Sequence, residues 1–130
     1  MHIYFPGGKK VFAEYKGFTI ETDQPVESGG ENSAPSPFDL FVTAIGTCAG
    51  FYVLGFCQQR NIPTAGITLN LEKKFDQTKG MIGEIAIIIN LPKDFPPQYR
   101  EAVIRAAELC AVKKHIADPP AFTIDTQIAS

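Results

Sequence analysis

Three cysteines, at positions 48, 57 and 110, are the residues of this 130-residue chain best suited to covalent chemistry. Cys48 lies in the stretch AIGTCAGFY, among small residues and inside a longer apolar run. A thiolate is a nucleophile that peroxides oxidise, whereas a thiol surrounded by apolar groups has a raised pKa and is inert. The sequence therefore poses one question, which is whether Cys48 packs or reacts.

The spacing of the cysteines argues against a metal site. Cys57 follows Cys48 by nine residues and Cys110 is far from both, which fits no zinc pattern, and the two histidines are widely separated. We expect no metal and no cofactor. The chain opens with no basic-then-apolar leader, so we expect a cytoplasmic protein, in which structural disulfides are uncommon and an odd cysteine count favours catalysis or packing.

A long helix positions Cys48. Ser36 as cap, Pro37 in the first turn and Asp39 three residues after the cap mark its start, and we expect it to run to about residue 60. Cys48 then lies about twelve residues inside, where the dipole of its own helix cannot lower its pKa. From the residues alone, Cys48 is either an inert packing thiol or a reactive one that needs a cation delivered from elsewhere.

The other two cysteines take different places. Cys57 lies about 180° around the helix from Cys48 and about 13 Å further along it, so the two cannot pair within the helix and Cys57 is expected to pack. Cys110 ends the apolar stripe of a second predicted helix, residues 98–110. If both helices cover the same sheet face, Cys48 and Cys110 meet. Two core cysteines and an attacking thiol with its resolving thiol are both compatible with this spacing.

Hydropathy patterning predicts an α+β fold with a mostly antiparallel sheet, in a single domain spanning residues 1–130. Residues 1–5 and 9–23 alternate apolar and polar side chains and predict a three-stranded meander. Residues 24–37 are rich in proline, glycine and serine and predict a loop before the long helix.

The C-terminal half contains the remaining strands. Residues 67–75 alternate, whereas residues 81–91 are apolar on both faces and predict a central strand. After the second helix we expect a short turn at 112–116 and a final strand at 121–128.

Composition excludes several classes of function. The net charge is −2 and no run of Lys or Arg exceeds two residues, which argues against nucleic acid or an anionic membrane as partner. The apolar run from Leu40 to Phe56 contains glycines and threonines and is shorter than the roughly 20 apolar residues that span a membrane. We expect this helix to be buried in protein.

Two segments together resemble the OsmC/Ohr family of thiol-dependent hydroperoxide reductases. They are PFDLFVTAIGTCAG, residues 37–50, and CAVKKH, residues 110–115, some sixty residues further on. The resemblance extends over nearly the whole chain, because the expected order of elements is also that of the family.

The resemblance implies an OsmC-like fold in an intertwined homodimer, with two active sites at the subunit interface. It implies that Cys48 attacks the peroxide O–O bond, becomes a sulfenic acid and is resolved by Cys110 as a disulfide. A dithiol reductant such as a lipoyl protein would then reduce the disulfide.

The chain departs from the arginine and glutamate that peroxidatic members of the family use to hold the thiolate. Lys9, in PGGKK, stands where the arginine is expected, and Phe38 stands where the glutamate is expected. We therefore assign Lys9 and Asp39, the neighbour of Phe38, as candidate catalytic residues. A lysine supplies charge without the bidentate fork of an arginine. Glu31 is a further carboxylate within the preceding loop.

Lys114 and His115, which follow the second cysteine, have weaker support for a functional role. Lys114 matches the family's lysine after the second cysteine, although a surface role fits equally. His115 has no matching role in the family and is expected to be structural.

The sequence thus favours a thiol peroxidase that reduces organic hydroperoxides in oxidative-stress defence. We expect four aromatic side chains to line the substrate site and to favour alkyl or lipid hydroperoxides over hydrogen peroxide: Phe38, Phe41, Phe51 and Tyr52. The alternatives are an OsmC-like protein that binds a small apolar or thiol ligand at the dimer interface without peroxidase activity, and a purely structural dimer module.

Overall fold

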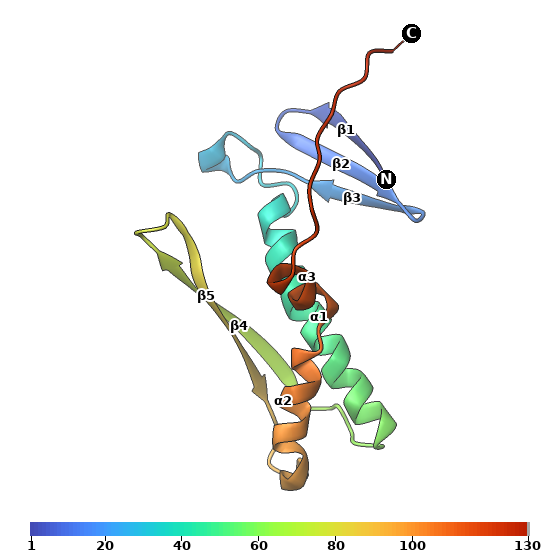
Figure 1. Cartoon of the computed structure of the whole chain (residues 1–130), viewed down its shortest axis with the longest axis vertical. Helices are drawn as coiled ribbons and strands as arrows, with labels where there is room; N and C mark the ends of the chain where they lie inside the picture. The colour runs from blue at the N-terminus through green and yellow to red at the C-terminus, as the bar shows by residue number, and fades with distance from the viewer. Residues whose placement is uncertain (130) are drawn as a thin grey trace. The chain divides into compact units, whose positions relative to one another are not determined.

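The computed structural model describes residues 1–129 and has the α+β architecture that the sequence predicts, with antiparallel sheets and one long helix (Figure 1). The chain divides into two compact units, Met1–Ala44 and a second unit that begins at Ile45. The long helix α1 (Pro37–Gln59) runs through the boundary. Each unit is described by itself below.

The first unit contains the expected meander. Strands β1 (His2–Gly7), β2 (Lys10–Tyr15) and β3 (Phe18–Thr22) pair antiparallel in sequential order. Gly8, with φ of 57°, lies in the first tight turn, where the left-handed conformation favours glycine.

Asp23 anchors the loop that links the meander to α1. Its side chain is 1% exposed, and its carboxylate accepts hydrogen bonds from the backbone N–H groups of Gln24, Glu31 and Ser33 and from the Ser33 hydroxyl at 2.6 Å. These bonds stabilise the ionised form and lower the pKa of Asp23 to about 2, the Ser33 hydroxyl contributing most. The loop predicted at 24–37 is therefore held by one carboxylate and includes only a single 3₁₀ turn, Val26–Ser28.

Helix α1 starts where the sequence predicts. The Ser36 hydroxyl accepts the N–H of Asp39 at 3.1 Å, and the Asp39 carboxylate accepts the N–H of Ser36 at 3.2 Å. This reciprocal capping box satisfies two backbone donors that the first turn leaves free.

The second unit is built on the C-terminal part of α1, a hairpin and a second helix (Figure 1). Strands β4 (Thr68–Asp76) and β5 (Met81–Asn90) form the two-stranded hairpin, and a 3₁₀ turn (Pro97–Tyr99) leads into α2 (Arg100–Glu108). The core of this unit comprises Val53, Phe56, Cys57, Ile62, Phe95 and Val103. The apolar stripe predicted for the second helix is confirmed, because Val103 is fully buried and Tyr99, Ala106 and Ala107 pack around the core.

The C-terminal half differs from expectation in three places. Within residues 1–129, β5 pairs with β4 alone, so it is not a central strand. The expected turn at 112–116 is helix α3 (Ala111–Ala117). The expected final strand at 121–128 forms no strand pairing in the described chain, and the side chain of Ile124 is 97% exposed. Alternation of residues predicts a strand conformation but not its partner, and a strand needs a neighbour for its backbone hydrogen bonds.

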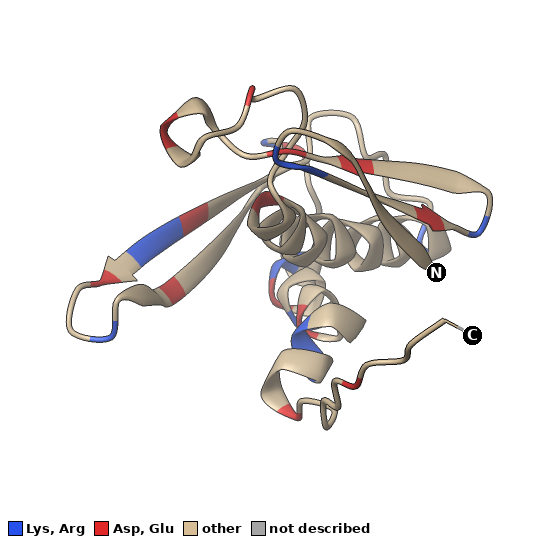
Figure 2. Cartoon of the chain, turned by 90° about the horizontal axis from the view of Figure 1, so that it is seen from above, with Lys and Arg blue, Asp and Glu red and all other residues tan. Residues whose placement is uncertain are grey.

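The expectation that α1 is buried in protein is only partly met. By length and composition alone the helix could cross a membrane, because its most apolar window has a mean hydropathy of 1.9. Only 28% of that window is buried inside the structure. Asp39 is its single charged residue, and Figure 2 shows the contrast with the charged residues on the β4–β5 hairpin. Much of this apolar surface is open in the single chain.

We expect Asp23→Ala to lower the melting temperature by several degrees at pH 7, since it leaves the donors of Glu31 and Ser33 without their acceptor. The pKa of Asp23 is lower in the folded protein than in the unfolded chain. Its contribution to stability is therefore complete above the unfolded pKa of about 3.9 and is lost as the pH falls through about 2. Thermal unfolding of both proteins between pH 7 and pH 2 measures this, and a melting-temperature difference that stays constant as the pH falls would contradict it.

Candidate active site at Cys48 and Cys110

Cys48 lies at the edge of the buried stripe of α1. The stripe consists of Ile45, Ala49, Val53, Phe56 and Cys57, which recur at helical spacing and face the core. Cys48 falls between Ile45 and Ala49 along the chain but is only half-buried. Cys48 is thus held by a packed helix while the residue itself is not fully buried.

A corner between two helices brings Cys110 to Cys48. Helix α2 ends at Glu108, α3 begins at Ala111, and Cys110 lies between them with φ of −49° and ψ of 122°, outside the helical region. Packing of Val103 against the core holds α2 in place. Cys110 is 1% exposed, and its thiol and the Cys48 sulfur are hydrogen-bonded to each other. The prediction that the two helices bring these cysteines together is confirmed.

Backbone groups lower the pKa of Cys48. The N–H of Val112 donates to the Cys48 sulfur and is the largest cause, followed by the Cys110 thiol; the N–H of Ala111 contributes as well. Hydrogen bonds to the charged form favour the thiolate, and here they outweigh desolvation. This direction favours the reactive interpretation of Cys48, because the start of a different helix supplies what its own helix cannot; the reactivity of Cys48 stays a prediction.

The other two thiols are shifted the opposite way. Burial raises the pKa of Cys110, and the hydrogen bond with Cys48 raises it further, because Cys110 is the donor of that bond. Burial also raises the pKa of Cys57, which is fully buried and packs in the core as predicted. The two sulfurs thus differ, because their surroundings favour the thiolate form of Cys48 and the protonated form of Cys110.

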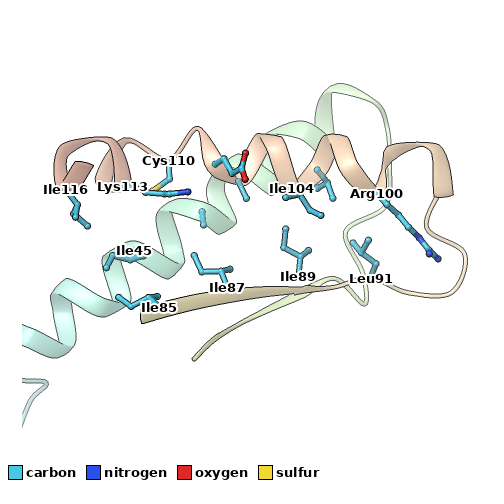
Figure 3. Close-up of a pocket in the computed structure, with 14 residues that line it drawn as sticks. Ile45, Ile85, Ile87, Ile89, Leu91, Arg100, Ile104, Cys110, Lys113 and Ile116 are labelled. Atoms are coloured by element: carbon cyan, nitrogen blue, oxygen red, sulfur yellow. The ribbon is translucent and has the colours of Figure 1, made fainter. Parts of the chain in front are cut away.

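An elongated apolar cavity of about 590 Å³ has Cys110 in its lining, toward the end formed by Lys113 and Ile116 (Figure 3). Its floor is a row of aliphatic side chains from β5 and the residue after it, Ile85, Ile87, Ile89 and Leu91, and its opposite wall comes from α2 and α3. Ile45 and Ala49, on either side of Cys48 in the chain, also line it. An apolar molecule lying in the cavity would contact Cys110, which is hydrogen-bonded to Cys48.

Two predicted catalytic residues, Lys9 and Asp39, belong to the first unit. Lys9 is exposed in the turn between β1 and β2, and its neighbour Lys10 forms an ion pair with Glu31 at 3.1 Å. Asp39 occupies the capping box of α1. Since Cys48 belongs to the second unit, a role for Lys9 or Asp39 beside the thiolate stays a prediction.

The four predicted aromatic residues are arranged as two neighbouring pairs on α1. The rings of Phe38 and Phe41 are 5.6 Å apart, as are those of Phe51 and Tyr52. The cavity is lined by aliphatic residues instead, and none of these four is among them. Their contact with a substrate stays a prediction. His115 has a structural contact, as expected, between its Nδ1 and the Ala111 carbonyl at 2.6 Å.

Comparison with protein families identifies the chain. The model of a family described as OsmC-like protein matches residues 30–125, which include both cysteines and most of the elements around them. The chain belongs to the OsmC-like family. A comparison with the sequences of curated proteins gave no match.

Solved structures share the OsmC-like fold. A protein assigned to the osmotic-stress and detoxification response of Psychrobacter arcticus superposes with a TM-score of 0.73 at 23% identity, over 87% of this chain and 84% of that one. The organic hydroperoxide resistance protein OsmC of Legionella pneumophila gives 0.60 at 18%, over 88% and 85%. OhrB of Bacillus subtilis, also an organic hydroperoxide resistance protein, gives 0.50 at 17%, over 88% of each chain. At these identities the likeness establishes the fold.

The site of this OsmC-like chain contains groups that the sequence analysis missed. The N–H groups of Ala111 and Val112 have no signature in the sequence, because every residue except proline carries one. Arg100 and Lys113, which line the cavity, were also missed. The only sequence signal for them was their position, since Arg100 lies on the predicted second helix and Lys113 lies just after Cys110.

We expect Cys48 to react with iodoacetamide faster than Cys57 and Cys110 near neutral pH. Its rate should rise as the pH increases through a pKa below the ordinary value of about 8.5, whereas the other two should need a higher pH. Peptide mass spectrometry across a pH series gives the three profiles. Cys110→Ala removes the thiol donor and should move the Cys48 profile to higher pH, while identical profiles for all three cysteines would refute the assignment.

Proposed function

We propose that this OsmC-like protein is a thiol peroxidase that reduces organic hydroperoxides, with Cys48 peroxidatic and Cys110 resolving. One observation carries the proposal, namely that the Cys48 sulfur accepts hydrogen bonds from the Val112 N–H and the Cys110 thiol, which lower its pKa. A thiolate beside a protonated thiol is the minimal equipment for peroxide reduction. Two solved structures of the same fold are named organic hydroperoxide resistance proteins, which agrees with this reaction class.

The chemistry balances with these two sulfurs. The Cys48 thiolate attacks the terminal oxygen of R–O–O–H, the O–O bond breaks, an S–O bond forms, and RO⁻ takes a proton to become the alcohol. Cys110 then attacks the Cys48 sulfenic acid, the S–O bond breaks, a disulfide forms, and the oxygen leaves as water with the Cys110 proton. Two thiols are oxidised and one hydroperoxide is reduced to an alcohol and water.

A dithiol closes the cycle. Its thiolate attacks one sulfur of the Cys48–Cys110 disulfide, and its second thiol releases both cysteines by exchange. A lipoyl protein is the reductant that we propose, in the cytoplasm, where dithiols are kept reduced. No metal or other cofactor enters this scheme.

The direct test is titration of the reduced protein with cumene hydroperoxide, followed by intact mass and peptide mapping. We expect the rapid loss of two hydrogens from the protein, mapped to a Cys48–Cys110 disulfide, at one equivalent of peroxide. In Cys48→Ser the disulfide should not form. In Cys110→Ser the Cys48 sulfenic acid should accumulate and be trapped by dimedone.

Cys57→Ala is the matched control, because Cys57 is buried in the core away from the pair and should leave disulfide formation intact. If the thiols stay reduced at equimolar peroxide, the peroxidase proposal fails.

The cavity favours a second candidate function, the binding of an apolar ligand without peroxide chemistry. The cavity is formed by aliphatic side chains and has a cysteine in its lining. This candidate predicts ligand binding that persists in Cys48→Ser, together with a Cys48 pKa of 8.5 or above. A structural dimer module without chemistry predicts that no thiol responds to stoichiometric peroxide.

We further propose that the protein works as an intertwined homodimer. A Cβ added at Gly50 of α1 would meet nothing within 4 Å, and the same holds at Gly55, about 140° around the helix, so α1 is open to a close neighbour at both positions. Phe51, on the same helix, is 66% exposed, and Phe122 and Ile124 of the extended C-terminal segment are 83% and 97% exposed. Apolar surface of this extent is typical of a protein interface.

We expect light scattering coupled to size exclusion to give twice the chain mass of 14.2 kDa. Gly50→Leu should shift the protein toward monomer, because a Cβ at this position meets nothing within 4 Å in its own subunit and the added bulk would occupy the space of a close neighbour. Lys79→Leu, in the exposed β4–β5 turn, is the control for a leucine introduced away from α1. A wild-type protein that is monomeric at micromolar concentration contradicts the proposal.

A further inference from the structure

The alkoxide that leaves when the O–O bond breaks needs a proton. In a displacement by sulfur, the leaving oxygen lies beyond the attacked oxygen, on the side away from the Cys48 sulfur. The Val112 N–H and the Cys110 thiol already donate to that sulfur, and the Cys110 proton is used later, when the disulfide forms. The proton donor for the alkoxide is therefore expected among other groups beside the cysteine pair.

The wall next to the pair offers one suitable donor. Four polar residues of the described chain line the cavity: Arg100, Glu108, Cys110 and Lys113. A carboxylate accepts hydrogen bonds and donates none, and Arg100 lies at the opposite end, near Leu91 (Figure 3). Lys113 remains, with an ammonium group that carries three donor hydrogens.

The position of Lys113 in the first turn of α3 places it next to both sulfurs. The residue before it, Val112, donates its N–H to Cys48, and the N–H of Lys113 itself donates to Cys110. Figure 3 shows the Lys113 side chain in the cavity, at the end where Cys110 lies. Its flexible four-carbon stem lets the ammonium reach an oxygen that is held against the pair.

The charge of Lys113 is not engaged in an ion pair. Within residues 1–129 neither Lys113 nor Glu108, the carboxylate that lines the same cavity, forms one. Lys113 is also exposed, so that a proton given up by its ammonium can be replaced from solvent.

Lys114, the residue that matches the family's lysine after the second cysteine, is placed differently. Lys113 and Ile116, three positions apart on one face of α3, both line the cavity. Lys114 is exposed and does not line it. The structure thus separates two neighbouring lysines that the sequence alone could not tell apart.

We propose that Lys113 is a catalytic residue of the peroxide step, the general acid that gives its proton to the leaving alkoxide. The Cys48 thiolate attacks the terminal oxygen of R–O–O–H, the S–O bond forms and the O–O bond breaks. RO⁻ takes a proton from the Lys113 ammonium and leaves as the alcohol, and solvent reprotonates the amine. This inference rests on the proposed function and adds a third residue to its two cysteines.

Peroxides with different leaving groups test this role. Cumene hydroperoxide expels a strongly basic alkoxide, which needs a proton, whereas perbenzoic acid expels a carboxylate, which does not. In single turnovers of the reduced protein, we expect Lys113→Met to slow the consumption of cumene hydroperoxide by about a hundredfold. The same variant should slow the consumption of perbenzoic acid by no more than about twofold.

Lys114→Met is the matched control, because it removes the neighbouring charge without changing the cavity wall, and it should consume both peroxides at wild-type rates. Alkylation of Cys48 by iodoacetamide is a second control, since iodide leaves without a proton. Lys113→Met should therefore keep the wild-type pH profile of alkylation. A profile moved to higher pH would show that Lys113 acts on the thiolate, the role predicted for Lys9, and would overturn the inference.

Other results separate this inference from the peroxidase proposal. Equal slowing of both peroxides in Lys113→Met would indicate a packing role, and wild-type rates with both would indicate no role. Either result overturns the assignment of Lys113 and leaves the peroxidase standing. A wild-type protein that consumes perbenzoic acid but not cumene hydroperoxide lacks the proposed acid. If it consumes neither, the peroxidase proposal fails and the role of Lys113 fails with it.

Discussion

The contact between Cys48 and the corner at Cys110 is the constraint on which the rest of the site depends. Packing of Val103 into the core fixes α2 against α1, and the break between α2 and α3 then turns the N–H of Val112 toward the Cys48 sulfur. The same break positions the Cys110 thiol as a donor to Cys48. Without it, Cys48 would be an ordinary thiol on an apolar helix.

Backbone groups stabilise the Cys48 thiolate, and this explains how the site tolerates charged residues that differ from the expected arginine and glutamate. Lys9 and Phe38 stand where peroxidatic relatives are expected to have arginine and glutamate. Backbone N–H groups do not depend on side-chain identity, so those substitutions leave the contribution of Val112 in place. The chain thus retains a lowered Cys48 pKa without those two side chains.

The fold of the single chain leaves apolar surface uncovered on both the long helix and the C-terminal segment. Phe51 and Ile124 are mostly exposed, and the helix face at Gly50 is open. A 130-residue chain can build one core, and here that core is confined to the C-terminal part of α1, the hairpin and α2. The uncovered surface is the physical reason to expect a second subunit, and it also explains why a strand predicted from alternation has no partner within the described chain.

The sequence by itself determined the elements whose signals are local. The capping box of Ser36 and Asp39, the meander and the apolar stripe around Val103 follow from side-chain periodicity and hydrogen-bonding chemistry along the chain. Tertiary structure alone decided the pKa of Cys48, since the largest cause of its lowering is the backbone N–H of Val112, which lies more than sixty residues away and belongs to a kind of group that almost every residue carries. It also decided the cavity, because which aliphatic residues face Arg100 depends on how β5 and α2 pack, and no periodicity encodes that.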